Sequence, residues 1–265
     1  MRTRVAIIGA GPAGLLLSHL LGGCGIDSVI LERHSRHYIE NRIRAGVLEY
    51  TTETLLTESG LGSRMKRDGI PHEGILLRFN RRDHRIDFRA LTGKHVTVYS
   101  QHLVVQDLVA ARTANRDNII FEAEEVALHD IATNPRVTFT QAGQSRSLSC
   151  DIIAGCDGSH GVSRHAIPAS AIHVYERDYP FGWLGILAEA PPSSDELVYV
   201  NHENGFALLS LRSATISRLY LQCTPNEDLT LWSDDRIWHE LHARTRRDGF
   251  ILNEGPILSR GVTPM

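Results

Sequence analysis

The chain opens on a short apolar run that leads into a glycine-rich segment. Val5–Ile8 are four consecutive apolar, mostly β-branched residues, a pattern typical of a parallel strand that is covered on both faces. Gly9-x-Gly11-x-x-Gly14 follows at once. The apolar residues from Leu15 to Leu21 then predict a helix that ends at Gly22-Gly23.

A second apolar run predicts the next strand of the same unit. Residues 27–31 end at Glu32, about 20 residues beyond the glycines. The order of strand, turn, helix, strand and acid predicts a dinucleotide-binding unit, in which Gly9 permits a tight turn. Gly11 lets the backbone approach a pyrophosphate at the helix N-terminus, and Gly14 lets helix and strand pack closely. We expect the carboxylate of Glu32 to accept hydrogen bonds from ribose hydroxyls.

The later pattern is partly α/β and partly β. The α/β part comprises helices at 47–59 and 101–113, strands at 118–121, 124–131, 137–140 and 151–155, and a helix after the turn that contains Asp157. The β part comprises a hairpin of residues 73–79 and 84–88, strands at 181–188, 196–201, 205–212 and 215–222, a helix at 234–246 and a strand-like tail at 255–265. We therefore expect a mixed α/β fold, with a Rossmann-like domain (1–71 and 97–172) interleaved with a β-sheet domain (72–96 and 173–265).

Composition narrows the function classes. The 265 residues are 42% hydrophobic and 22% charged, and a formal net charge of −3 gives no electrostatic case for nucleic acid or an anionic membrane. No apolar run approaches the ~20 residues of a membrane span, and the first strand starts too early for a signal peptide. Four cysteines without paired spacing indicate reduced thiols in a cytoplasmic protein, and 14 scattered histidines predict no metal site.

Two polar stretches allow two interpretations each. The basic loop after Glu32 carries Arg33, Tyr38, Arg42 and Arg44, and it borders the expected nucleotide cleft. These residues contact a phosphate or cofactor, or they form a solvated face. Asp157, at the end of a strand, is an ordinary turn acid or a group that recognises a nucleotide hydroxyl.

A set of motifs distributed along nearly the whole chain carries a family resemblance. The motifs are Gly9-Ala10-Gly11-Pro12-Ala13-Gly14, Leu31-Glu32-Arg33, residues 42–49, 67–69 and 72–74, Ala154-Gly155-Cys156-Asp157-Gly158, His160-Gly161, residues 179–185 and residues 210–215. On these motifs the chain resembles the single-component FAD-dependent aromatic hydroxylases, in particular those that act on 4-hydroxybenzoate. The glycine motif is shared by many flavoproteins, whereas the last two segments are more specific because they belong to the substrate side.

The resemblance implies cofactors, a reaction and partners. It implies FAD as cofactor, and NADPH and O₂ as cosubstrates in the hydroxylation of 4-hydroxybenzoate to 3,4-dihydroxybenzoate during aromatic degradation. It also implies a homodimer. The residues implied for FAD are Glu32, Arg44, Gln101, Asp157 and Arg218, and those implied for NADPH are Arg33, Tyr38, Arg42, Arg44, Asp157 and His160. Arg164 is a further candidate cofactor-binding residue.

The same resemblance assigns a substrate site. Ser210, Arg212 and Tyr220 match a clamp on the substrate carboxylate, for which the planar guanidinium fork is well suited. Tyr199 matches the tyrosine that hydrogen-bonds the phenol oxygen, and His72 matches the outer end of a proton path from it. On the residues alone, the alternative is an arginine–tyrosine patch on a sheet face.

The chain departs from the family pattern at its end. The family continues beyond the position of Met265 with a segment that completes the flavin site. We therefore expect a C-terminally truncated chain that, by itself, is poorly soluble or binds FAD weakly and does not hydroxylate. Two alternatives to the main interpretation remain at this point. One is an FAD monooxygenase of the same fold that acts on another aromatic acid, and the other is an inactive, truncated nucleotide-binding fragment.

Overall fold

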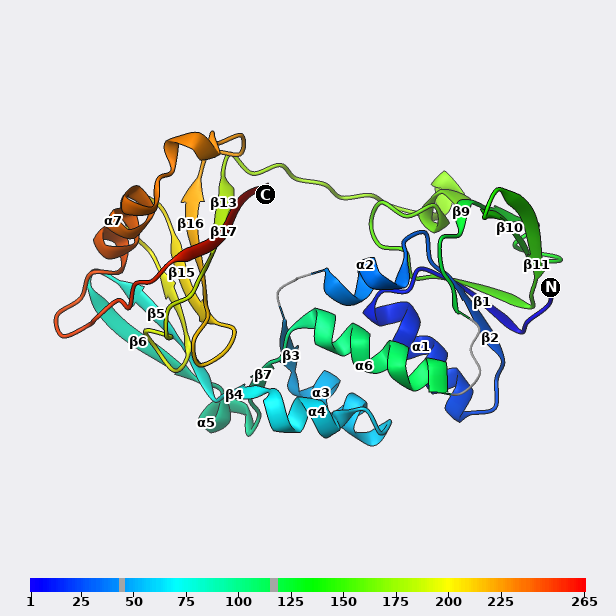
Figure 1. Ribbon diagram of the computed structural model, residues 1–265, viewed down its shortest axis with the longest axis horizontal. Coiled ribbons are helices and arrows are strands. Elements are labelled where there is room, and N and C mark those ends of the chain that lie inside the picture. Colours follow the sequence, from blue (N-terminus) through cyan, green and yellow to red (C-terminus); the bar gives the residue numbers. More distant parts are fainter. Residues whose placement is uncertain (43–45, 115–118) are drawn as a thin grey trace. The chain divides into compact units, whose positions relative to one another are not determined.

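The structure is a computed structural model that describes residues 1–42, 46–114 and 119–265. The chain divides into two compact units, each made of several segments (Figure 1). The first unit comprises Met1–Gly46, Glu53–Asp68 and Tyr99–Val174, and the second comprises Val47–Thr52, Gly69–Val98 and Tyr175–Met265. The α/β fold class predicted from the sequence is confirmed.

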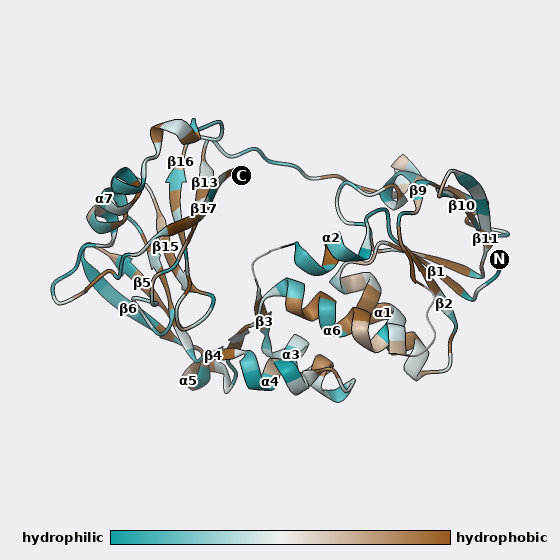
Figure 2. Ribbon diagram, in the orientation of Figure 1, coloured by the Kyte–Doolittle hydropathy of each residue, from teal (hydrophilic) through white to brown (hydrophobic). Residues whose placement is uncertain are grey.

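A four-stranded parallel sheet forms the centre of the first unit. Its order is β12-β1-β2-β8, with β1 (Val5–Ile8), β2 (Ser28–Leu31), β8 (Ile119–Ile120) and β12 (Ile152–Gly155). Every residue of β1 and β2 is buried, as expected for inner parallel strands, and apart from Ser28 at the start of β2 both strands are hydrophobic (Figure 2). Asn118, the first residue of the strand predicted at 118–121, lies outside the described residues.

Different elements cover the two faces of this sheet. Helices α1 (Pro12–Gly23) and α6 (Gln101–Ala114) lie side by side, and the hydroxyls of Ser18 in α1 and Ser28 in β2 share a 2.8 Å hydrogen bond. On the other face an antiparallel sheet of β9 (Glu124–His129), β10 (Arg136–Gln141) and β11 (Gln144–Ser149) contributes Phe139 to a core with Ala6 and Val29. The sequence pattern did not predict β11, whose exposed residues are mostly polar.

Two helix predictions need correction. The segment 47–59 is not one helix, because β3 (Val47–Glu49) pairs with β7 (Val96–Val98) and only α3 (Tyr50–Glu58) is helical. The turn at Asp157 leads to the 3₁₀ helices η1 (Ser163–Ala166) and η2 (Ala169–Ala171) instead of an α-helix. Pro168 lies between them and offers no backbone N–H. The remaining helices of the first unit are α2 (Arg36–Asn41) and α4 (Gly62–Asp68).

A seven-stranded sheet forms the second unit. Its order is β17-β13-β16-β15-β14-β5-β6, with β5 (Gly74–Phe79), β6 (Arg82–Asp87), β13 (Gly182–Ala188), β14 (Leu197–Val200), β15 (Ala207–Leu211), β16 (Ser217–Cys223) and β17 (Ile257–Pro264). All neighbours are antiparallel except β14 and β5. A small sheet of β3, β7 and β4 (Ile70–His72), helix α5 (Phe88–Thr92) and the 3₁₀ helix η3 (Leu229–Leu231) complete the unit.

Helix α7 (Asp234–Thr245) packs on one face of the large sheet (Figure 1). Its start is stabilised by Ser233, whose hydroxyl accepts the backbone N–H of Arg236 at 3.2 Å. Ile237, Trp238 and Leu241 face a core made by the buried residues of β13–β16. The strands therefore have one face in the core and one face free for polar side chains. None of the helices in the described ranges combines the length and the apolar character that a membrane crossing requires.

A buried ion pair ties the end of α7 to the β5–β6 hairpin. The side chain of Arg78 is 2% exposed, and its Nε and Nη2 donate to the two carboxylate oxygens of Asp83 at 2.6 and 3.0 Å. Its Nη1 donates to the carbonyl oxygen of Thr245 at 2.7 Å, and its guanidinium lies 4.1 Å from the ring centre of Phe250. Because a buried guanidinium is costly without its carboxylate, Asp83 stabilises Arg78 in this position, and the bond from Arg78 to Thr245 joins the hairpin to the end of α7.

We predict that Asp83→Ala destabilises the protein by about 3 kcal/mol, because it leaves the buried charge of Arg78 without its carboxylate. Denaturant unfolding measures this loss. The control is Asp68→Ala, which breaks the equally bidentate but exposed pair of Arg67 and Asp68 and is expected to have little effect. Equal denaturant concentrations at the unfolding midpoints of the two variants would contradict the role assigned to the buried pair.

Candidate functional site

The turn between β1 and α1 depends on close backbone contacts. Gly9 has a φ of +101°, and a Cβ there would lie 2.7 Å from the carbonyl oxygen of Cys156. A Cβ on Gly14 would lie 2.0 Å from the carbonyl oxygen of Gly9, so α1 sits directly against the turn. Gly11 differs, because no protein atom lies within 4 Å of the position of its Cβ. The backbone at Gly11 is therefore open to a ligand at the N-terminus of α1.

Glu32 joins the ends of β1 and β2. Its carboxylate is 7% exposed, and its two oxygens accept the backbone N–H groups of Ala10 and His34, each at 2.8 Å. An ionised carboxylate has about four acceptor positions, so acceptors remain for a ligand. Glu32 thus shapes the turn itself, a role that the sequence interpretation did not include.

A cavity of about 400 Å³ lies beside this turn, within the size range of small-molecule sites. Among the residues predicted from the sequence, its lining contains Gly9, Gly11, Glu32, Arg33, Tyr38, Arg42, Gln101, Asp157 and His160. Gly14 lies beneath the turn, Arg164 is in the lining of a neighbouring groove, and Arg44 is outside the described residues. The structure therefore brings together residues separated by more than a hundred positions in sequence.

His34 belongs to the cavity edge, although the sequence analysis did not single it out. Its ring lies 4.2 Å from the ring of Tyr38, and its Nε2 accepts the Nε–H of Arg33 at 3.1 Å. The guanidinium of Arg42 lies 5.5 Å from the ring centre of Tyr38. This cavity edge, made by Arg33, His34, Tyr38 and Arg42, places two neighbouring rings between two arginines. Its only sequence signal was the position of His34 directly after Glu32 and Arg33.

Asp157 shapes the loop on the other side of the cavity. Its Oδ2 accepts the backbone N–H of Ser163 at 2.9 Å, and a Cβ on Gly161 would lie within 2.1–2.5 Å of the carboxyl group. Arg164 donates from Nη1 to the carbonyl oxygen of Ser159 at 2.6 Å. These contacts give both side chains a structural part in the loop, while Asp157 also lines the cavity.

The second unit presents a polar sheet face that comes from strict alternation in β15 and β16. The buried residues are Ala207, Leu209 and Leu211 in β15 and Ser217, Leu219 and Leu221 in β16, and the residues between them point to the opposite face. The register pairs Ser210 with Arg218 and Leu208 with Tyr220, while Tyr199 of β14 pairs with Leu208. The strand pairing thus brings Tyr199, Ser210, Arg218 and Tyr220 onto one face, with Arg212 directly after β15.

Two arginines on this face lack the carboxylate that arginines in such surroundings usually have. The Nε atoms of Arg212 and Arg218 are buried and have no hydrogen-bond partner among the described residues. Burial lowers the pKa of Arg212, Tyr220 opposes this shift, and the nearby charge of Arg218 adds to it. Ser210 donates its hydroxyl to the carbonyl oxygen of Arg218 at 2.7 Å and keeps its lone pairs as acceptors. Such a face favours an anionic ligand.

Aromatic rings border the arginines. The ring of Phe206 lies 5.9 Å from that of Tyr199 and 4.7 Å from that of Trp183. Trp183 in turn lies 6.2 Å from Tyr220. Arg218 is over the ring of Tyr220 at 5.1 Å. The sheet face therefore combines planar apolar walls with a cationic end, as a ring-shaped carboxylic acid would require.

His72, at the end of β4, is 1% exposed, and neither ring nitrogen has a hydrogen-bond partner among the described residues. Burial lowers its pKa, and the charges of Glu196 and Asp195 oppose that shift. The structure shows no hydrogen bond between Tyr199 and His72 in the described ranges. The proton path predicted between them therefore stays a prediction.

Comparison with known proteins places the chain in a family. The model of the family described as FAD binding domain matches residues 2–250, and the chain belongs to this family of FAD-binding proteins. The chain is 46% identical over 267 aligned residues to p-hydroxybenzoate hydroxylase of Acinetobacter baylyi, with 100% of this chain and 66% of that protein covered. It is 28% identical to a 3-(3-hydroxy-phenyl)propionate/3-hydroxycinnamic acid hydroxylase of Burkholderia vietnamiensis, with 69% of this chain and 34% of that protein covered.

Solved structures support the fold. A variant of PqsL from Pseudomonas aeruginosa has a TM-score of 0.80 at 19% identity, covering 93% of this chain and 68% of that one. The p-nitrophenol 4-monooxygenase PnpA from Pseudomonas putida has a TM-score of 0.77 at 16% identity, covering 99% and 68%. At this level of identity the likeness concerns the fold alone.

The residues around the cavity fit the adenosine diphosphate part of FAD. Gly11 leaves open space at the first turn of α1, where exposed N–H groups favour phosphate, and Glu32 retains acceptor positions for ribose hydroxyls. FAD is the cofactor that the family implies, and the described residues form a suitable cradle for this half of it.

We predict that Gly11→Ala weakens FAD binding about tenfold or more without lowering the stability of the apoprotein. The new methyl group meets no protein atom but occupies the space in which a pyrophosphate would approach the backbone. Gly14→Ala is expected to destabilise the apoprotein itself, because its methyl group meets the carbonyl of Gly9. Gly23→Ala, also free of contacts, is the control for both measurements, which are flavin titration and thermal unfolding. Unchanged FAD affinity in Gly11→Ala would remove the turn from the cofactor site.

A second prediction concerns pH. The pKa of His72 in the folded protein lies below its unfolded value of about 6.5, so the unfolded chain binds this proton first as the pH falls. The free energy of unfolding therefore decreases as the pH drops below about 6.5, until folded His72 also takes up the proton. His72→Gln is expected to flatten this slope in denaturant unfolding between about pH 7.5 and 5. The exposed His239 gives the control variant His239→Gln, which keeps the wild-type slope; equal slopes for all three proteins would contradict the prediction.

Proposed function

We propose that the protein is an FAD-dependent monooxygenase that hydroxylates 4-hydroxybenzoate to 3,4-dihydroxybenzoate with NADPH and O₂. The observation that carries this proposal is the partly buried pair Arg212 and Arg218, whose buried Nε atoms have no hydrogen-bond partner among the described residues and which lies beside an aromatic wall. In a chain 46% identical to a p-hydroxybenzoate hydroxylase, an aromatic carboxylate is the anion that fits such a face. The cytoplasmic location and the homodimer expected from the sequence stay predictions.

The substrate roles follow from the donors on the sheet face. Arg212 offers a planar fork to the substrate carboxylate, and the hydroxyls of Ser210 and Tyr220 complete its hydrogen bonds. Tyr199 hydrogen-bonds the phenol oxygen at the far end of the ring and stabilises the phenolate, which reacts more readily with an electrophilic oxygen. His72 receives the phenol proton at the end of the path: burial lowers its pKa and so favours the neutral imidazole, which has one ring nitrogen free to accept a proton.

The cofactor roles follow from the cavity. Glu32, at the turn, and Gln101, at the start of α6, hold FAD. Asp157 and Arg164 belong to the loop that borders the cavity on the other side. Arg218 is not part of the cavity lining, and the role proposed for it, to position the flavin, rests on the family resemblance. Arg33, Tyr38, Arg42 and His160 contact NADPH, with Arg33 and Tyr38 at its 2′-phosphate, and Arg44 belongs to both nucleotides. When bound, FAD would supply the redox and oxygen chemistry: NADPH would provide two electrons and O₂ the oxygen, of which one atom would enter the ring and the other would leave as water.

A second candidate is a related monooxygenase for another aromatic acid, which the similarity to a 3-(3-hydroxy-phenyl)propionate/3-hydroxycinnamic acid hydroxylase favours. NADPH oxidation by the FAD-loaded protein, measured with 4-hydroxybenzoate and with 3-hydroxybenzoate, separates the two. Stimulation by 4-hydroxybenzoate with formation of 3,4-dihydroxybenzoate supports the proposal. Stimulation by the 3-hydroxy isomer alone supports the second candidate.

We predict that, in a version with the full length of the p-hydroxybenzoate hydroxylase relative, Arg212→Lys weakens 4-hydroxybenzoate binding by at least ~1.4 kcal/mol, a factor of ten, because lysine keeps the charge but loses the fork. Substrate titration of the FAD-loaded protein, followed by the flavin absorbance, gives the affinity. The control is Arg82→Lys at an exposed position of β6. An affinity equal to that of the wild type would exclude Arg212 from the substrate site.

A further inference from the structure

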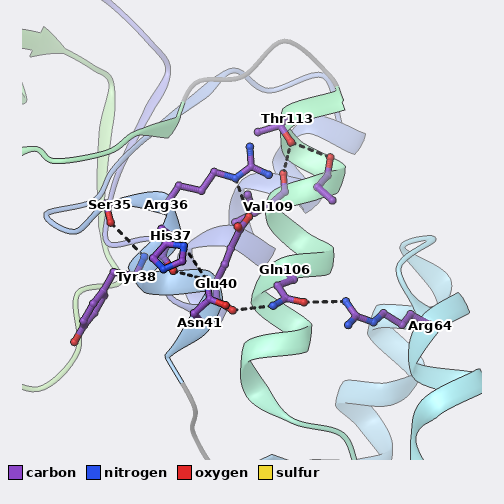
Figure 3. Close-up of polar contacts among 11 residues, drawn as sticks. Ser35, Arg36, His37, Tyr38, Glu40, Asn41, Arg64, Gln106, Val109 and Thr113 are labelled. Atoms are coloured by element: carbon purple, nitrogen blue, oxygen red, sulfur yellow. Dashed lines mark hydrogen bonds and ion pairs between the residues drawn. The ribbon is translucent and has the colours of Figure 1, made fainter.

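Helix α2 carries part of the cavity edge but has little to hold it in place. It has six residues, and none of them is buried. The hydroxyl of Ser35 accepts the backbone N–H of Tyr38 at 3.2 Å, and Arg36 pairs with Glu40 at 2.8 Å (Figure 3). A helix this short is not stable by itself in water, and these local contacts contribute little. Contacts from outside must therefore fix its position.

Gln106 of α6 provides such a contact. Its Nε2 donates to the backbone carbonyl oxygen of Glu40 at 2.8 Å (Figure 3). Carbonyls in the last turn of a helix have no partner within the helix, so this bond satisfies a group that α2 leaves open. The amide oxygen of Gln106 accepts the Nη1–H of Arg64 at 3.1 Å, which fixes the orientation of the amide.

Arg64 is itself held by further polar contacts. Its Nη1 also lies 3.2 Å from Oδ1 of Asp107, the residue next to Gln106. The other oxygen of Asp107 accepts the hydroxyl of Tyr99 at 2.5 Å, and Tyr99 is only 2% exposed. Figure 3 shows the series from Arg64 through Gln106 to the end of α2. The last turn of α2 is therefore connected to α4, α6 and a buried ring.

The residues of this series do not line the cavity, whereas their neighbours on α2 do. Tyr38, Ile39 and Arg42 belong to the cavity lining, and Glu40 lies two residues from both Tyr38 and Arg42. Moving the carbonyl of Glu40 would move the ring of Tyr38 and the guanidinium that lies over it. The polar series consequently controls the position of these two side chains without touching a ligand.

We propose that Gln106, oriented by Arg64, is a positioning residue for the pyridine nucleotide. It holds α2 so that Tyr38 and Arg42, together with Arg33, present a ring and two cations to the phosphate-bearing ribose of NADPH. This inference rests on the proposed function, which assigns the cavity edge to NADPH. It adds that coenzyme preference depends on a residue that contacts no coenzyme.

The test uses Gln106→Leu, which removes both hydrogen bonds at nearly constant size in a helix that tolerates leucine. The matched control is Gln141→Leu, because Gln141 is also half-buried in the first unit and donates to a backbone carbonyl, that of Phe121, at 3.1 Å. The measured quantities are the dissociation constants for NADPH, NADH and FAD, and the hydrogen exchange of a peptide covering residues 36–42. We expect the preference for NADPH over NADH to fall about tenfold in Gln106→Leu alone, with FAD affinity changed less than about threefold.

The hydrogen exchange of α2 tests the role of Gln106 independently of the proposed function. Faster exchange in Gln106→Leu, together with the loss of preference, supports the positioning role. Unchanged exchange, or equal effects in Gln141→Leu, would overturn it. A wild-type protein without preference for NADPH contradicts the coenzyme assignment of the proposed function, and the exchange measurement then still decides whether Gln106 holds α2. Gln106→Glu, which keeps an acceptor for Arg64 but loses the donor to Glu40, is expected to behave like Gln106→Leu.

Discussion

The contact between Gly14 and the carbonyl of Gly9 is the constraint on which the first unit depends. Because no side chain separates them, α1 lies against the end of β1, and the N-terminus of the helix meets the edge of the parallel sheet. Glu32 then joins the ends of β1 and β2 through two backbone N–H groups. The cavity exists at this edge because the strand ends, the helix start and the loop of Asp157 converge there. Function in this unit is therefore a property of backbone geometry as much as of side chains.

Buried arginines in the second unit fall into two groups. Arg78 and Arg244 are almost fully buried, and each is satisfied: Arg78 by Asp83 and a carbonyl, Arg244 by Glu240 and the carbonyls of Phe206 and Gln222. Arg212 and Arg218 have buried Nε atoms without partners in the described part of the chain. A buried arginine whose N–H groups are all hydrogen-bonded stabilises the fold, whereas a buried N–H without a partner costs free energy of folding. Arg212 and Arg218 therefore mark the position of a ligand anion.

The sequence predicted the elements that are governed by local spacing. The glycine turn, Glu32, the hairpin and the helices at α6 and α7 follow from patterns that span a single turn or strand, and the structure contains all of them. Ser210, Arg218 and Tyr220 also share a face because alternate residues of a strand point the same way. Their roles came from family resemblance, since the pattern alone does not distinguish a site from an ordinary patch.

Tertiary structure decided what depends on partners far away in sequence. Residues 47–49 became a strand because β7 supplies hydrogen bonds to them, which outweighs their helical pattern. His34 joined the cavity edge because the ring of Tyr38, four residues later, lies against it, and His72 is buried although its sequence neighbours Pro71 and Glu73 are exposed. Gln106 meets Glu40 only because α6 packs beside α2. Local spacing determines which residues share a turn or a face, whereas strand register and helix packing determine which faces meet.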